Sequence, residues 1–201
     1  DDGLFGGVST YIRQGLPFEF EAQRNDMPEW LMNTGCLNVI RFDQFTLVNT
    51  YFPYSNTADE KWIQIRRQWD YELHDYLVKL SNEKPLIVCG DMNIVATDKD
   101  AWDGVSVRNA GCYFPWEHKN FDGMMRAAGL VDSYRVLHPD GSDFSYFYQN
   151  KPEYRLLNQG FRIDYCLVSG DLLPYLTKSK ILTDVSETTN SPLIIEICLF
   201  V

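Results

Sequence analysis

The chain has 201 residues, of which 45% are hydrophobic and 14% aromatic, a composition that excludes wholesale disorder and fits a globular domain with a substantial core. Its formal net charge of -10 repels polyanions, so a nucleic acid would need a local cationic groove or a metal ion. No apolar run reaches the roughly 18–20 residues of a membrane span, and the five cysteines lack zinc-type spacing, which together indicate an intracellular protein of a reducing compartment.

Seven short apolar or β-branched runs predict the strands of the chain. In chain order they cover residues 7–12, 37–42, 45–52, 85–91, 144–149, 162–169 and 192–200. The second and third of these strands are expected to form a hairpin, because only the tight turn within RFDQF separates them.

Two helices are predicted between the strands. Over 60–80, apolar residues recur at a spacing of three to four and the opposite face is charged. A second helix over 116–128 follows a proline and stops before a glycine, whereas 97–113 has no periodicity and is expected to be a loop. Hairpins and crossovers are mixed, and neither a linker nor a repeat interrupts the chain. We therefore predict a single α+β domain over residues 1–201.

The segment PLIVCGDMNIVATDKD (85–100) is the strongest candidate for chemistry. A buried strand ends in it, and Asp91 and Asn93, two residues apart, are expected to point the same way at the strand's end. An aspartate there can orient or deprotonate a water, and the asparagine amide can hydrogen-bond a phosphate oxygen. A strand-to-loop turn in which both residues cap backbone amides explains this fragment equally well.

Two other strands carry polar candidates. Arg162 and Asp164 are expected on one face of a strand, which indicates either an internal ion pair or a functional site, and the fragment alone favours the ion pair. Tyr51 stands at the end of another strand, where a tyrosine can donate a hydrogen bond to phosphate but more often packs.

Several segments, taken in order, carry a family resemblance. They read GGVSTYIR, FTLVNTYFPYSN, RRQWDYELHDYLVKL, PLIVCGDMNIVATDKD, NAGCYFPWEHKNFDGMMRAAGLVDSYRVLHP and FRIDYCLVS, followed by the closing strand. In this set the chain resembles the exonuclease III-type AP endonucleases of the endonuclease/exonuclease/phosphatase superfamily, most closely the eukaryotic branch. The resemblance covers essentially all 201 residues. It implies a four-layer α/β sandwich, in which two packed mixed β-sheets are flanked by helices, and Mg²⁺-dependent cleavage of a phosphodiester beside an abasic site or at a 3′ end.

The same resemblance implies roles for four catalytic candidates. Asp91 matches the residue that activates or positions the water, and Asn93 matches its phosphate-binding companion. Tyr51 matches the family's site tyrosine, and Asp164 matches the aspartate that orients a catalytic histidine.

Nucleic-acid contacts are implied at four further positions. Arg162 lies beside Asp164, and Asn109 falls in the matching loop. Phe161 and Tyr146 occupy places where the family puts aromatic walls around a flipped-out abasic sugar.

The chain departs from the family in its closing motif. The family's Ser-Asp-His-x-Pro reads TTNSP here, so Thr189 and Asn190 replace an aspartate on the metal side and the catalytic histidine. Losing one group that stabilises a transition-state charge costs on the order of 2.7–4 kcal/mol in barrier. Tyr54 replaces a family asparagine, and the strands that would carry the metal-binding glutamate are expected upstream of Asp1, so that the fold would be N-terminally incomplete. We expect no bound metal, and Mg²⁺ only if the protein is active.

These departures predict a catalytically degenerate domain retained as a structural or binding module. Its expected partners are protein or RNA in a larger ribonucleoprotein or organellar assembly, with DNA as a further ligand and no membrane, in the mitochondrion or nucleus. The alternative is an active Mg²⁺-dependent phosphodiesterase, an AP endonuclease or 3′ exonuclease of DNA repair. A superfamily phosphatase acting on a small phosphoester is a third hypothesis.

Overall fold

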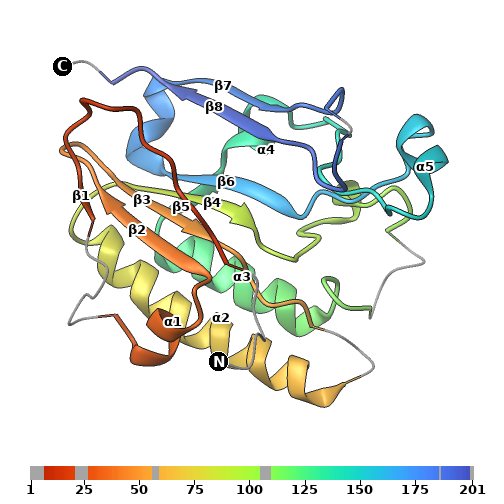
Figure 1. Ribbon diagram of the computed structural model, residues 1–201, viewed down its shortest axis with the longest axis horizontal. Coiled ribbons are helices and arrows are strands. Elements are labelled where there is room, and N and C mark those ends of the chain that lie inside the picture. Colours follow the sequence, from red (N-terminus) through yellow and green to blue (C-terminus); the bar gives the residue numbers. More distant parts are fainter. Residues whose placement is uncertain (1–6, 21–26, 56–58, 105–109, 186, 200–201) are drawn as a thin grey trace.

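A six-stranded mixed sheet forms the centre of the molecule. The computed structural model describes residues 7–20, 27–55, 59–104, 110–185 and 187–199. The sheet has the strand order β1-β2-β3-β4-β6-β5. Its strands are β1 (Glu19–Phe20), β2 (Leu37–Arg41), β3 (Thr46–Thr50), β4 (Leu86–Asp91), β5 (Leu130–Asp132) and β6 (Asp164–Ser169). A two-stranded sheet of β7 (Leu176–Ile181) and β8 (Leu193–Ile197) lies over one face, and α2 and α3 cover the other (Figure 1).

The two long helices form where the sequence supplies an apolar face and a start signal. In α2 (Glu60–Ser81), Asp59 caps the first turn by accepting a hydrogen bond from the Lys61 amide at 2.9 Å, and Trp69 is fully buried against the sheet. In α3 (Pro115–Ala127), the proline occupies the first turn, where no amide hydrogen is needed. The short helices are α1 (Glu29–Asn33), α4 (Ser133–Leu137) and α5 (Pro152–Leu156), with 3₁₀ turns at Asp98–Asp100 and Gly170–Tyr175.

Strand directions bring three chain segments to one edge of the large sheet. β3 and β4 run parallel, and β6 is antiparallel to β4. The carboxyl ends of β3 and β4 therefore meet the amino end of β6. Gly90 allows the close approach at this edge: its φ is +136°, and a Cβ there would lie 1.8 Å from the Thr50 carbonyl oxygen. Tyr51 and Asp91 are thus held on neighbouring strand ends.

Two predicted strands are absent from the described structure. Residues 7–12 run without strand pairing across β2 and β3, where the amide groups of Asn38 and Asn49 donate to the carbonyls of Val8 (3.1 Å) and Ser9 (3.0 Å). Residues 144–149 form only isolated bridges at Tyr146. The apolar side chains of this segment are buried by tertiary packing of a loop, so their hydrophobicity did not indicate a strand.

The other predicted elements are confirmed to within two residues at most boundaries, and the α+β class is confirmed. The strand predicted over 192–200 is observed over Leu193–Ile197, and the strand predicted over 162–169 begins at Asp164. The described part of 97–113 is loop apart from the turn Asp98–Asp100. Sequence reasoning missed α1, α4, α5, β1, β5 and β7, all of six residues or fewer.

Candidate active site

Four of the predicted catalytic residues come together at one edge of the sheet. Asp91 ends β4 and Asp164 begins β6, and the two are direct partners in the antiparallel register. Tyr51 follows β3, and its side chain lines a cavity together with Asp91 and Asn93. The structure thus places the four residues that the resemblance groups near one edge of the sheet.

Asn93 is fixed on all sides. It has a φ of 43°, a left-handed conformation that asparagine tolerates better than most residues. Its amide nitrogen Nδ2 donates to the Phe52 carbonyl at 2.8 Å, and its side-chain oxygen faces the Cys112 sulfur at 3.6 Å. Its backbone amide donates to Asp91 Oδ1 at 2.9 Å. One of the two Nδ2 hydrogens of Asn93 is therefore already engaged before any phosphate oxygen binds.

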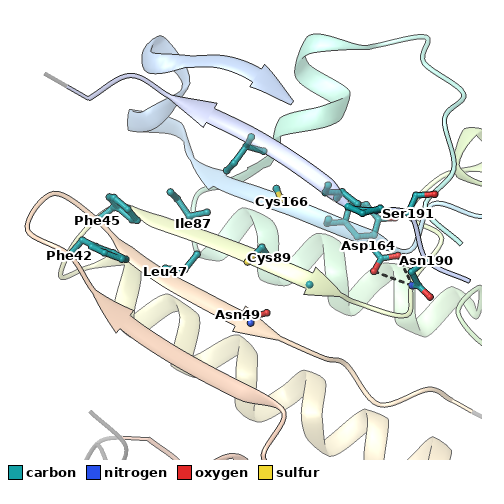
Figure 2. A pocket seen from close by; sticks show the side chains of 15 residues that line it. Phe42, Phe45, Leu47, Asn49, Ile87, Cys89, Asp164, Cys166, Asn190 and Ser191 are labelled. Carbon is teal, nitrogen blue, oxygen red and sulfur yellow. Dashed lines mark hydrogen bonds between the residues drawn. The ribbon is translucent and has the colours of Figure 1, made fainter. Parts of the chain in front are cut away.

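Asn190 takes the place beside Asp164 that the resemblance gives to a histidine. Its Nδ2 donates to the two carboxylate oxygens of Asp164 at 3.3 and 3.0 Å (Figure 2). Its own side-chain oxygen accepts a hydrogen bond from the Thr189 hydroxyl at 2.9 Å. The carboxamide reproduces the hydrogen bond to Asp164, but it is neutral and cannot carry a proton to or from a reacting group.

The Asp91–Asp164 pair is electrostatically unfavourable when both carboxylates are ionised. Burial raises the pKa of Asp91, the neighbouring Asp164 raises it further, and the Asn93 amide and Arg66 only partly oppose this. Burial also raises the pKa of Asp164, against hydrogen bonds to Ser145 and Asn190. Burial likewise raises the pKa of Tyr51, as does the negative charge of Asp91. Each of the three groups therefore keeps its proton to a higher pH than it would in the unfolded chain.

Arg162, predicted to contact nucleic acid, is instead the centre of a buried ion-pair network. Its side chain is 2% exposed, with Nε 2.7 Å from Asp100 Oδ1 and Nη2 2.7 Å from Asp132 Oδ2. Arg135 also pairs with Asp100. Burial leaves the Arg162 guanidinium no surface for a phosphate, which corrects that prediction. The sequence had also allowed an internal ion pair for Arg162, and this interpretation is correct. Its partners, however, are Asp100 and Asp132 and not Asp164.

The two aromatic candidates do lie beside the site. Phe161 and Tyr146 exchange backbone hydrogen bonds of 2.9 and 2.8 Å and line a cavity of about 410 Å³ whose wall includes Asp91 and Asn93. Six aromatic side chains contribute to that wall: Tyr51, Tyr54, Tyr113, Tyr146, Tyr148 and Phe161. Among its described lining residues, none is lysine, arginine or histidine. Asn109 lies outside the described residues.

Sequence reasoning missed two arginines that hold the site together. Arg66 on α2 donates to the carbonyls of Pro53 (3.1 Å) and Asn93 (3.0 Å) and so fixes the loops that follow β3 and β4. Arg155 on α5 donates to the Thr188 carbonyl (2.9 Å) and to the Ser191 hydroxyl (2.7 Å), on either side of Asn190. Neither position carries a sequence signal, because both arginines act on segments remote in the chain.

The oxygen ligands for Mg²⁺ are few at this edge. Asp91, Asp164 and the Asn190 carboxamide are the candidates, and Asn190 already uses both ends of its amide. Within the described ranges, no group of three or more His, Cys, Asp or Glu side chains could hold a metal ion. A hard divalent cation takes about six oxygen ligands and favours carboxylates. The described residues therefore do not fit a complete magnesium site.

A second cavity has Asp164 in its wall. It has a volume of about 620 Å³ and separates the face of β3 and β4 from β8, with Phe42, Phe45, Leu47 and Ile87 in its lining (Figure 2). Asp164 and Asn190 lie at one end of it. The cavity lies between the two sheets, and its lining is mainly apolar. It therefore has few groups that could bind a charged substrate.

Comparison with known families identifies the class. The model of the endonuclease/exonuclease/phosphatase family matches residues 1–186. The chain therefore belongs to this family, and its mixed sheets with flanking helices are the family's fold.

Within the family, the similar proteins include an AP endonuclease, a DNA repair nuclease and exodeoxyribonucleases. The DNA repair nuclease APEX1 of Danio rerio is 32% identical over 152 residues, which are 76% of this chain and 48% of that protein. The DNA-(apurinic or apyrimidinic site) endonuclease of Dictyostelium discoideum is 34% identical over 143 residues, which are 70% of this chain and 39% of the relative. The chain thus spans about half or less of these relatives. An AP endonuclease structure from Archaeoglobus fulgidus shares the fold, with a TM-score of 0.80 at 20% identity over 90% of this chain and 72% of that one.

Proposed function

We propose that this member of the family is catalytically degenerate and binds nucleic acid without cleaving it. One observation carries the proposal: the amide of Asn190 donates to Asp164, where the resemblance places a histidine. A phosphodiester that breaks accumulates negative charge, and a neutral carboxamide stabilises that charge less than an imidazolium does. The hydroxyl of Thr189 adds no charge and is engaged by Asn190.

The missing metal ligands support the same proposal. The aspartate of the closing motif is replaced by Thr189, and the described residues hold no third carboxylate beside Asp91 and Asp164. When bound in this family, Mg²⁺ would neutralise charge on the phosphate. Of the residues that the structure describes at the cavity wall, Tyr51 and Asp91 can orient a bound group, and none is a cation that would replace the metal.

Cleavage of a duplex that contains one abasic site tests the proposal. With Mg²⁺ present, we expect the natural chain to cleave the duplex no more than buffer alone does. The Asp91→Ala variant is expected to give the same result. Turnover by the natural chain that disappears in Asp91→Ala would overturn the proposal. Calorimetric titration with Mg²⁺ alone is expected to give no saturable heat, and a site lost in Asp164→Asn would count against degeneracy.

The alternative function, an active Mg²⁺-dependent phosphodiesterase, has one observation in its favour. Asp91 and Asp164 face each other in register and raise the proton affinity of the site, as carboxylates that share a cation do when the cation is absent. The abasic-site assay separates the two functions directly.

Partners and location belong to the proposal as well. We propose protein or RNA partners in a larger assembly, in a reducing compartment such as the mitochondrion or nucleus. All five cysteines are free, which fits that environment. Among the residues that the structure describes, no helix is both long and apolar enough to span a membrane.

A further inference from the structure

Five aromatic rings form a continuous series from the cavity to the surface. From the inside outward they are Phe161, Tyr146, Tyr148, Tyr154 and Trp102, called here the aromatic ladder. Successive ring centroids are 6.5 Å apart (Phe161–Tyr146), 5.7 Å (Tyr146–Tyr148), 6.3 Å (Tyr148–Tyr154) and 6.2 Å (Tyr154–Trp102). Tyr148 and Trp102 are 42% and 41% exposed. The ladder therefore joins the cavity wall to solvent.

The backbone holds the ladder in place without a ligand. The Trp102 amide donates to the Gly160 carbonyl at 3.0 Å, next to Phe161. The Gln159 amide donates to the Tyr154 carbonyl at 2.7 Å, which closes the turn after α5. A Cβ at Gly160 would lie 2.6 Å from the Phe147 ring, so the chain can pass here only with glycine. Rings fixed in this way lose little conformational entropy when they bind a ligand.

The charges around the ladder define what it can bind. The described lining of the cavity contributes no cation to hold a phosphate group, and Asp91 repels phosphate whenever its carboxyl group is ionised. Outside, Lys151 Nζ lies 4.7 Å from the centroid of Tyr154 and donates to its hydroxyl at 2.8 Å. The cavity therefore suits an uncharged planar ring, while a negative charge can reach the lysine at the rim.

Unpaired nucleobases have this distribution of properties. Each base is an uncharged planar ring whose phosphate lies on the outside of the strand, and bases stack on tyrosine and tryptophan. A cavity of about 410 Å³ is within the usual range of small-ligand sites. Bases in a duplex are already stacked, and an abasic sugar has no ring to stack.

We propose that the aromatic ladder binds consecutive unpaired bases of a single-stranded nucleic acid, with one base in the cavity and its neighbours on Tyr148 and Trp102. This inference rests on the proposed function, because it takes the domain to bind nucleic acid, and it adds which form is bound and by which residues. Lys151 contacts one phosphate at most, so the salt dependence of binding is shallow.

Fluorescence anisotropy with labelled eight-nucleotide oligouridylate and oligothymidylate tests the proposal. Trp102→Ala and Tyr148→Ala are each expected to weaken binding roughly 5- to 150-fold, the loss of one stacked base. The matched control is Tyr71→Ala, because Tyr71 is 71% exposed on the remote helix α2 and should leave binding unchanged. Lys151→Gln should make the slope of log K against log salt about 0.7 less negative.

Three results would overturn the inference, and they are distinguishable. If binding persists in both Trp102→Ala and Tyr148→Ala, the aromatic ladder does not bind the nucleic acid, but the proposed function is unaffected. If the natural chain binds no oligonucleotide, both the ladder inference and the proposed nucleic-acid binding are wrong. An equal loss in Leu156→Ser, at an exposed leucine on α5 outside the ladder, would indicate a general apolar surface for a protein partner.

Discussion

At Asp91, burial and a facing carboxylate determine how the site responds to pH. The folded protein raises the pKa of Asp91 above that of the unfolded chain, so the folded state binds the extra proton. The stabilisation from this proton is complete below the unfolded pKa of about 4 and is lost as the pH rises toward neutrality. The free energy of unfolding should therefore fall over that window.

Asp91→Asn removes this loss, since asparagine keeps the oxygen that accepts from the Asn93 amide and carries no charge. We expect the variant to be more stable than the natural chain by about 1–2 kcal/mol at pH 7 and nearly equal to it at pH 3. Urea unfolding at both pH values measures this. A variant that is less stable at pH 7 would show that the ionised carboxylate stabilises the fold.

Arg66 is a second residue whose environment predicts a large effect. Its guanidinium is 1% exposed, with Nε 2.7 Å from Asp70 Oδ1 and Nη1 3.7 Å from Glu117 Oε1. Arg66→Leu leaves two buried carboxylates without their cation, and removing one partner of a buried pair costs about 3–5 kcal/mol. Arg67→Leu is the matched control: Arg67 is exposed over the Trp116 ring, and its loss should cost less than about 1 kcal/mol. Equal losses in both variants, measured by urea unfolding, would contradict this.

At the scale of elements, one short helix holds the segment that contains Thr189 and Asn190. Arg155 of α5 donates to carbonyls at Thr183, Val185 and Thr188, and its guanidinium stacks 4.4 Å from the Phe147 ring. The described residues 183–185 and 187–189 belong to no strand, so the Arg155 contacts hold this segment together with the hydrogen bond from the Phe147 amide to the Thr189 carbonyl.

Arg155→Ala should therefore release the segment while leaving the large sheet intact. We expect a loss of about 2 kcal/mol in unfolding free energy and at least tenfold faster hydrogen exchange at the Phe147 amide, which donates to the Thr189 carbonyl. Exchange within β4 should not change. Arg155→Lys keeps the positive charge but lacks the several N–H donors of the guanidinium. Full recovery in that variant would show that these donors are not needed.

The elements that could be predicted from the sequence are those whose pattern is local. The stripe of α2 and the buried run of β4 gave correct boundaries within one residue, because periodicity and burial coincide there. Residues 144–149 misled because Phe144 and Phe147 are buried by a loop, and β7 was missed because its exposed positions carry lysine and threonine. Tertiary packing decides such segments, and local pattern does not.

The candidate site shows the same division. The family resemblance grouped Asp91 with Asp164, and the two are direct partners in the register of β4 and β6. The role of Arg162 depended on Asp100 and Asp132, which are remote in the chain and reach it through loop and strand packing. Which charged neighbour an arginine finds is a property of the folded chain.

At the scale of the whole molecule, the net charge of -10 limits how the protein can meet a nucleic acid. The positive charges of Arg66 and Arg162 do not reduce the negative charge of the surface, because both arginines are paired with carboxylates inside the molecule. A duplex, which offers its phosphates before its bases, should therefore bind weakly.

We predict that a 20-base-pair duplex without unpaired bases binds with a dissociation constant of about 10⁻⁴ M or weaker at physiological salt, and that the slope of log K against log salt is no steeper than about -2. Anisotropy titrations between 50 and 200 mM salt measure both quantities. A slope near -6 would mean that about seven phosphates are neutralised, and would require a cationic groove that outweighs the acidic balance of the chain. A shallow slope, together with tighter binding of single strands than of the duplex, would indicate that the protein recognises nucleic acid mainly by ring stacking, because stacking releases no counterions.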